Sequence, residues 1–344
     1  MRGLLSKRVF PFLQLTRLAL VFTAISNSLC TLMLANRQKM GEDAGGTVLR
    51  YWSWTEAGLI ALVSFGLYAY GMSLNDIIDR RRDRTLAAHR PLPSGRISVT
   101  AAHILCSGFG LLAVVAGGLY SRVSDQGWLS FVILCGTGLL ITFYDAAGKY
   151  LVALGLVTLG LIRFFHAIIP APQVPLLWHP LLLMNHTTIL SLVAYRWEQK
   201  RPALTKVHWW TVLGSVALFD LVLIGLEAGD LLWQGTRSPE AVMREFGIRP
   251  ALIAPMVAAL GFILLAWRVR RRHERRIAGQ MIMLYGLLWL IVYDVSFAAG
   301  YVDPLAALLL LLLLPMAYGG VQIMRWWGRM VVLSQKPEFR RAEE

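Results

Sequence analysis

The stretch that decides the fold is an apolar run that leads directly into a group of acids. Residues 55–74 read TEAGLIALVSFGLYAYGMSL, and residues 75–83 continue as NDIIDRRRD. About 20 largely apolar residues are long enough to cross a bilayer as a helix. The stretch therefore predicts a membrane helix that carries Asn75, Asp76, Asp79 and Asp83 where it leaves the membrane.

The whole chain has the composition of a membrane protein. Of its 344 residues, 56% are hydrophobic and 16% are charged, whereas soluble domains carry roughly 25% charged residues. The net charge of +14 comes from side chains in short loops between apolar runs. That pattern indicates membrane topology and contact with anionic lipid headgroups, and it excludes a nucleic-acid partner. Cys30, Cys106 and Cys135 lie inside apolar runs without metal-site spacing, so we expect buried thiols.

The apolar runs predict ten spans and an all-α fold, a polytopic bundle of nine to ten membrane helices. Of the 34 lysines and arginines, 25 then fall on the side of the N-terminus and seven on the other side. This bias places the N-terminus and the acids in the cytoplasm. No linker or repeat divides the chain, so residues 1–344 are expected to form one membrane domain. The spans are expected at 14–34, 55–74, 99–120, 127–144, 150–169, 176–195, 209–228, 250–267, 279–299 and 304–324.

The spacing of the acids indicates a metal site. If the helix continues past residue 74, Asp76, Asp79 and Asp83 share one face within about 60° of one another. Carboxylates this close repel one another unless a cation lies between them, and hard oxygen ligands favour Mg²⁺. The alternative is a solvated helix end whose acids are neutralised by Arg80, Arg81, Arg82 and Arg84.

A basic loop follows the acids. Residues 90–96 read RPLPSGR, and the prolines and Gly95 should end the helix and turn the chain back towards the third span. The turn would bring Arg84, Arg90 and Arg96 near the acids. Magnesium combined with arginines is a common way to hold a diphosphate.

These residues resemble a known family. Residues 75–95 are similar to the first aspartate-rich motif of the UbiA-type membrane prenyltransferase superfamily, NDxxDxxxD followed by RPLxSG. Residues 17–34 resemble that superfamily's first helix, and FYDAAGK at 143–149 resembles its tyrosine followed by a basic residue. The resemblance implies a helical bundle around a central cavity and transfer of an isoprenyl group from its diphosphate to a lipophilic, often aromatic, acceptor.

The resemblance also implies residue roles. Asn75, Asp76, Asp79 and Asp83 would hold Mg²⁺, and the three aspartates would act in catalysis. Lys149 would act with them at the diphosphate. The diphosphate would further be contacted by Arg90 and Tyr144. Apart from the resemblance, the turn at 90–96 would place Arg84 where it can also contact the diphosphate, and Asp145 could lend a carboxylate from the neighbouring loop.

The chain departs from the family where a second aspartate-rich motif is expected. Residues 195–206 contain one acid, Glu198, among several basic residues, which makes a poor magnesium cage. One interpretation is that Lys200 and Arg201 neutralise the diphosphate, with Glu198 as an auxiliary ligand or base. A second interpretation is that ionisation of the prenyl diphosphate is weakened and that the fold serves another purpose. A third interpretation is that Lys200 and Arg201 only set the orientation of the chain in the membrane.

Four ionisable residues fall inside other spans: Arg163, His166, Asp220 and Asp294. Charges at this depth are costly and should pair or face a cavity. We expect an ion pair of Arg163 with Asp220 or Asp294. The alternative is that His166 or one of the acids meets the acceptor and takes its proton.

The sequence as a whole predicts a magnesium-dependent prenyltransferase in a bacterial cytoplasmic membrane. Its partners would be a prenyl diphosphate, a lipophilic acceptor and the lipid bilayer. Two alternatives remain: a terpene cyclase or lyase that uses the same ionisation, and a non-catalytic lipid-binding membrane scaffold.

Overall fold

The computed structural model describes Leu15 and residues 20–41, 46–88, 90–199, 202–233, 235 and 238–334. Within these ranges the chain is helical and has no strand. Each predicted span corresponds to a helix, except that the last one is divided at Leu312 into two helices. The long helices are α3 (Val21–Met40), α4 (Trp54–Leu86), α5 (Val99–Val123), α6 (Gly127–Ala146), α7 (Val152–Ile168), α8 (Trp178–Trp197), α9 (Lys206–Trp233), α11 (Ile253–Arg272), α12 (Arg275–Tyr301), α13 (Pro304–Leu311) and α14 (Leu313–Ser334).

Among the residues that the structure describes, seven helical segments are long and apolar enough to cross a membrane: α4, α5, α6, α9, α11, α12 and the α13–α14 pair. Helix α7 is apolar but shorter. Helices α3 and α8 carry more polar residues and are largely buried among the others. The chain is therefore an all-helical membrane protein, and the exact number of nine to ten spans stays a prediction.

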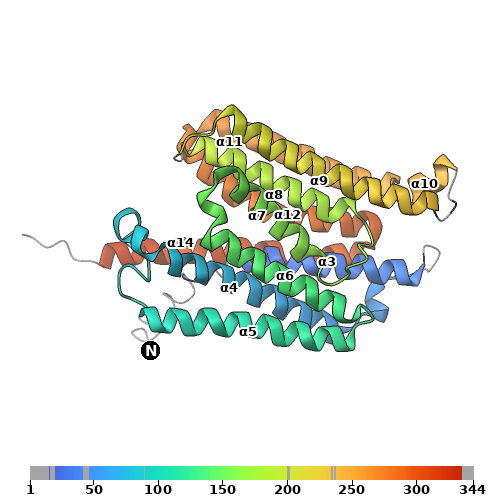
Figure 1. Ribbon diagram of the computed structural model, residues 1–344, viewed down its shortest axis with the longest axis horizontal. Coiled ribbons are helices and arrows are strands. Elements are labelled where there is room, and N and C mark those ends of the chain that lie inside the picture. Colours follow the sequence, from blue (N-terminus) through green and yellow to red (C-terminus); the bar gives the residue numbers. More distant parts are fainter. Residues whose placement is uncertain are drawn as a thin grey trace, which may run out of the picture.

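The helices run side by side along the long axis of the molecule (Figure 1). Helix α3 packs against α4, α7 and α12, and α12 also packs against α8, α11 and α13. Helices α9 and α11 expose most of their side chains, including many leucines and tryptophans. In a membrane protein such apolar surfaces face lipid. The polar helices α3 and α8 therefore lie inside, where their side chains can meet one another.

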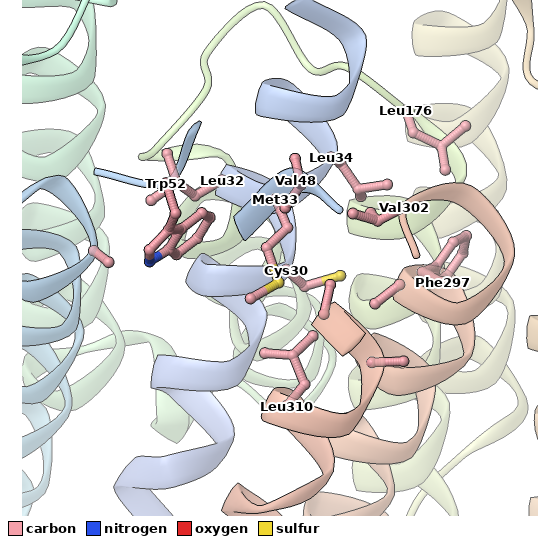
Figure 2. Close-up of a cluster of buried hydrophobic side chains, with 14 residues drawn as sticks. Cys30, Leu32, Met33, Leu34, Val48, Trp52, Leu176, Phe297, Val302 and Leu310 are labelled. Atoms are coloured by element: carbon pink, nitrogen blue, oxygen red, sulfur yellow. The ribbon is translucent and has the colours of Figure 1, made fainter. Parts of the chain in front are cut away.

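One end of the bundle is held by an apolar cluster that joins α3, α12 and α13 to the short helix η3 (Val48–Tyr51). It includes Cys30, Met33, Phe297 and Leu310 (Figure 2). Trp52 of the same cluster precedes the start of α4, whereas the acids lie near the end of that helix. With 33 residues, α4 is roughly 50 Å long, so this cluster and the acids lie at opposite ends of the bundle.

Candidate active site

The acids lie on a continuous helix, as the spacing predicts. Ser53 caps the N-terminus of α4 by accepting a hydrogen bond from the Glu56 amide, and the helix runs without a break to Leu86. Asp76 and Asp83 are 4% and 6% exposed, so this helix end is not a simple solvated surface. The alternative of a freely solvated acidic helix end is therefore wrong.

The basic loop folds back onto the acids. Arg90 Nη1 donates to Asp83 Oδ2 at 2.6 Å and lies 3.7 Å from Asp76 Oδ1. Ser94 Oγ donates to the Arg90 carbonyl at 2.6 Å, and Gly95 has a φ of +72°, a left-handed conformation that favours glycine. The loop therefore orients the Arg90 guanidinium between two carboxylates.

A second cation reaches the acids from the neighbouring helix. Lys149 lies in the short helix η4 (Gly148–Tyr150), directly after α6. Its ammonium donates to Asn75 Oδ1 at 3.0 Å and lies 2.9 Å from Asp79 Oδ1 and 3.7 Å from Asp145 Oδ1. The approach to Asp79 is an ion pair without hydrogen-bond geometry, so that oxygen can still accept another partner. The structure thus brings the 143–149 segment to the acids.

The donor set suits Mg²⁺. Four carboxylates (Asp76, Asp79, Asp83 and Asp145) and the Asn75 amide oxygen supply hard ligands, and Arg90 and Lys149 contact them. Among the residues described, however, no three of these carboxylates converge within the 4.8 Å that would form a ready cage. The two cations lie between the acids instead.

A cavity lies inside the bundle beside the acidic motif. It has a volume of about 290 Å³, and Asn75, Tyr144 and Asp145 line one part of it. Arg163 and His166 line it farther along α7. The wall between these polar regions is largely apolar and includes Leu67, Met72, Ile141, Leu159, Ile162, Met283 and Leu287. The cavity is therefore an apolar chamber with Asn75 and Asp145 at one end and the half-buried cation Arg163 in its wall.

Arg163 does not form the expected ion pair. Its Nη1 donates to Asn27 Oδ1 at 3.0 Å, and Asn27 Nδ2 donates to Asp294 Oδ2 at 2.7 Å. Asp294 is paired with His179 Nε2 at 2.8 Å, and Asp220 accepts instead from Asn185. The prediction was wrong because the amide of α3 lies between the two charges, a position that only helix packing decides.

Sequence reasoning did not assign roles to Asn27 and His179, although a polar side chain inside an apolar span was an available signal. Cys30, His179 and Asp294 also bring metal-type ligand atoms within 4.8 Å of one another. These groups satisfy one another: Cys30 Sγ donates to the Asp294 carbonyl, and Thr31 Oγ1 lies 3.3 Å from His179 Nδ1. We interpret this cluster as packing that joins helices.

The other predicted site residues lie farther from these contacts. Arg84 is exposed on α4, and Arg96 Nε donates to Ser94 Oγ. Glu198 packs against Gly279 of α12, where a Cβ would come within 2.8 Å of Glu198 Cγ. Lys200 and Arg201 lie outside the described residues. The roles predicted for these residues therefore stay predictions.

Comparison with known proteins agrees with this architecture. Residues 48–183 match the sequence profile of the UbiA prenyltransferase family. A protoheme IX farnesyltransferase from Shewanella baltica (strain OS155) is 32% identical over 226 residues, which cover 61% of this chain and 69% of the relative. A protoheme IX farnesyltransferase from Shewanella oneidensis is 40% identical over 91 residues, covering 26% of this chain and 29% of the relative.

A solved structure of a digeranylgeranylglyceryl phosphate synthase has the same fold. It superposes with a TM-score of 0.55 over 85% of this chain and 97% of that protein, at 15% sequence identity. At this identity the likeness concerns the fold alone. The matched profile covers the acids, Arg90 and Lys149, and the Shewanella baltica match extends over two thirds of that relative. The chain therefore belongs to the UbiA prenyltransferase family.

Proposed function

We propose that this prenyltransferase moves an isoprenyl group from a prenyl diphosphate to a lipophilic, aromatic acceptor with the help of Mg²⁺. The observation that carries the proposal is that Arg90 and Lys149 lie between acids beside an apolar cavity, with Lys149 contacting Asn75 and Asp145, which line that cavity. A diphosphate carries charge that these cations can share, and its hydrocarbon chain suits the apolar wall.

We expect some residues of the site to bind the metal ion and others to stabilise the diphosphate as it leaves. Asn75, Asp76, Asp79 and Asp83 would hold Mg²⁺, which would offset the negative charge of the leaving diphosphate. Lys149 and Arg90, which contact the acids, would offset the growing charge of a diphosphate bound beside them. The allylic C–O bond then breaks, and its electron pair leaves with the diphosphate.

The apolar wall protects the reactive carbon. Exclusion of water by side chains such as Leu67, Ile141 and Met283 prevents capture of the allylic cation by hydroxide or water. The face of Tyr68, which also lines the cavity, can stabilise a cation through its π system. The aromatic acceptor supplies the electron pair of the new bond to the prenyl carbon, and its ring then loses a proton to the released diphosphate, which is a base.

The named relatives suggest which substrates to test first. They are protoheme IX farnesyltransferases, so farnesyl diphosphate is the first donor and protoheme the first acceptor to try. Geranyl and geranylgeranyl diphosphate extend the donor series, and 4-hydroxybenzoate and menadiol extend the acceptor series.

The test uses the purified full chain in lipid nanodiscs with each donor, with and without Mg²⁺. We expect magnesium-dependent pyrophosphate release coupled to a prenylated product detected by mass spectrometry. Asp76→Ala and Asp79→Ala should each lower turnover by about 10²-fold or more. Asp125→Asn, which changes an exposed acid paired with Lys39, is the matched control.

Three results would contradict the proposal. A cyclised or eliminated hydrocarbon without acceptor incorporation would favour a cyclase or lyase. Absence of pyrophosphate release with every donor, in a folded protein, would favour the non-catalytic scaffold. Activity that survives both aspartate variants would remove the acids from the reaction.

A further inference from the structure

The inner part of the cavity contains a histidine that the reaction so far leaves unused. His166 is 5% exposed, and neither of its ring nitrogens has a hydrogen-bond partner in the structure. It lines the same cavity as Asn75 and Asp145. Burial of an unpaired polar ring costs free energy. An unpaired imidazole at a cavity wall therefore points to a ligand group that completes its hydrogen bonds.

Two further polar side chains, those of Arg163 and Thr187, line the same cavity as His166. Arg163 precedes His166 by one helical turn on α7, so the two side chains project from the same face. Thr187, on α8, also lines the cavity, and its buried hydroxyl has no hydrogen-bond partner. Together these three side chains form what we call the inner polar site.

A hydrocarbon tail does not suit the inner polar site. A prenyl chain against Arg163, His166 and Thr187 would leave a charge and two polar groups without partners. The apolar wall along Leu159 and Ile162 suits that chain better. Since the diphosphate belongs at the acids, the remaining polar substrate group is that of the acceptor.

The charge of the inner polar site favours an anionic oxygen. Arg163 is separated from Asp294 by Asn27, while Asp294 is paired directly with His179. The arginine charge is therefore not cancelled by a direct ion pair. A neutral imidazole offers one N–H donor, and a threonine hydroxyl offers another. A carboxylate or phenolate would accept from these groups, and charge-assisted hydrogen bonds are the strong ones.

We propose that Arg163, His166 and Thr187 bind a carboxylate of the acceptor and so make the enzyme prefer an acid acceptor over its ester. This inference rests on the prenyltransferase function proposed above. Asn27 is a positioning residue, because its amide orients the Arg163 guanidinium towards the cavity wall. Binding at this end places the acceptor between the inner polar site and the acids, beside the carbon that ionises.

The test compares acceptors that differ only in whether their carboxyl groups are free or methylated. Protoheme is paired with its dimethyl ester, and 4-hydroxybenzoate with its methyl ester, each with farnesyl diphosphate and Mg²⁺. We expect the wild type to have a kcat/KM at least about tenfold higher for the acid than for the ester. His166→Ala and Arg163→Gln should remove that preference, mainly through a higher KM for the acid. Neither should alter the KM for farnesyl diphosphate.

Two variants separate binding from folding. His186→Ala removes another buried histidine of the same interior, one that is bonded to Gly286 and Tyr293 and does not line the cavity. It should retain the acid preference even where it lowers stability. Arg163→Lys keeps the charge and should retain part of the preference if Arg163→Gln fails to fold.

The outcomes are distinct. An active wild type that uses acid and ester equally well, or His166 and Arg163 variants that keep the preference, would overturn the inference and leave the prenyltransferase function intact. Failure of the wild type to transfer to any acceptor, despite a folded protein, would overturn the proposed function and this inference with it.

Discussion

At the scale of single residues, the site depends on cations that lie between acids. Lys149 contacts Asn75, Asp79 and Asp145, and Arg90 contacts Asp76 and Asp83. Both cations come from parts of the chain other than the helix that carries the acids Asp76, Asp79 and Asp83. The spacing of the acids therefore predicts where the negative charges lie, but not which cations neutralise them. The positions of the cations depend on how α6, η4 and the 90–96 loop pack against α4.

Replacement of Lys149 by methionine should separate metal binding from turnover. Loss of the ammonium removes a positive charge from the acids, so the affinity for Mg²⁺ without substrate should rise about tenfold or more. Turnover of farnesyl diphosphate should fall, because the diphosphate loses a cation. Isothermal titration calorimetry and a pyrophosphate-release assay measure the two effects.

Lys39→Met is the matched control for this prediction. Lys39 also pairs with an aspartate, Asp125, at 2.8 Å, but this pair is exposed and lies away from the acids. It should change neither the affinity for Mg²⁺ nor turnover. An unchanged or weaker affinity in Lys149→Met would show that the ammonium does not compete with the metal.

At the scale of helices, the position of the acids depends on how closely α4 packs against α5. Gly66 allows this approach: a Cβ at that position would lie 2.8 Å from both the Ala113 amide nitrogen and the Phe109 carbonyl oxygen. Backbone atoms cannot rotate away as a side chain can. The residue type at 66 thus sets the distance between the two helices.

Gly66→Ala should lower the free energy of unfolding by about 1–3 kcal/mol, because the added methyl group overpacks the contact between α4 and α5. Gly58→Ala is a control on the same helix, since no atom lies within 4 Å of its Cβ position. It should be neutral or slightly stabilising. Thermal unfolding in detergent measures both variants, and equal shifts would argue against tight packing at Gly66.

Asp303 joins two elements at the opposite end of the bundle. Its Oδ1 accepts from the amides of Leu305 and Ala306 at the start of α13. Its Oδ2 accepts from Thr47 Oγ1 and the Val48 amide at η3. Partial burial alone would raise the pKa of Asp303, but these hydrogen bonds outweigh it and hold the pKa below the usual 3.8.

The lowered pKa makes this junction sensitive to acid. A depressed carboxyl pKa contributes stability above its unfolded value, and that stability is lost as the pH falls through the folded value. We therefore expect the wild type to lose stability below about pH 4 more steeply than Asp303→Asn. Asp303→Ala should cost about 1 kcal/mol at neutral pH through loss of the helix cap. Unfolding followed by circular dichroism between pH 2 and 7 tests this, and parallel profiles for wild type and Asp303→Asn would contradict it.

At the scale of the whole molecule, a buried polar network joins four helices. It connects Arg163 on α7 to Asn27 on α3, then to Asp294 on α12 and His179 on α8. These helices enclose the cavity, so the network holds its inner wall in place. It also satisfies charges that would otherwise be costly inside a membrane.

Removal of Asp294 should destabilise the fold strongly. Asp294→Ala leaves Arg163 and the amide of Asn27 without the acid that completes the network, which should cost about 3–5 kcal/mol. Asp220→Ala is the comparison, because Asp220 is also an acid within a span but is half-buried and has one hydrogen-bond partner, Asn185. It should cost less. Thermal unfolding in nanodiscs measures the difference, and similar losses would show that the network adds little.

The residues that sequence reasoning recognised owe their arrangement to local rules. The apolar runs predict the helices because transfer into lipid depends on each segment's own composition. The common face of Asp76, Asp79 and Asp83 follows from the helical repeat, and the return of Arg90 follows from the prolines and Gly95. Lys149 was recognised through the resemblance of its segment to a family, not through any local rule.

The sequence by itself thus determined the membrane class, the helices and the acidic motif at Asn75 to Asp83. Only the tertiary structure decided the partners. Arg163 meets Asn27 instead of an acid, and His166 faces a cavity with neither ring nitrogen paired. The physical reason is that helix periodicity and hydropathy act within a segment, whereas ion pairs and cavities depend on which helix faces pack together across hundreds of residues.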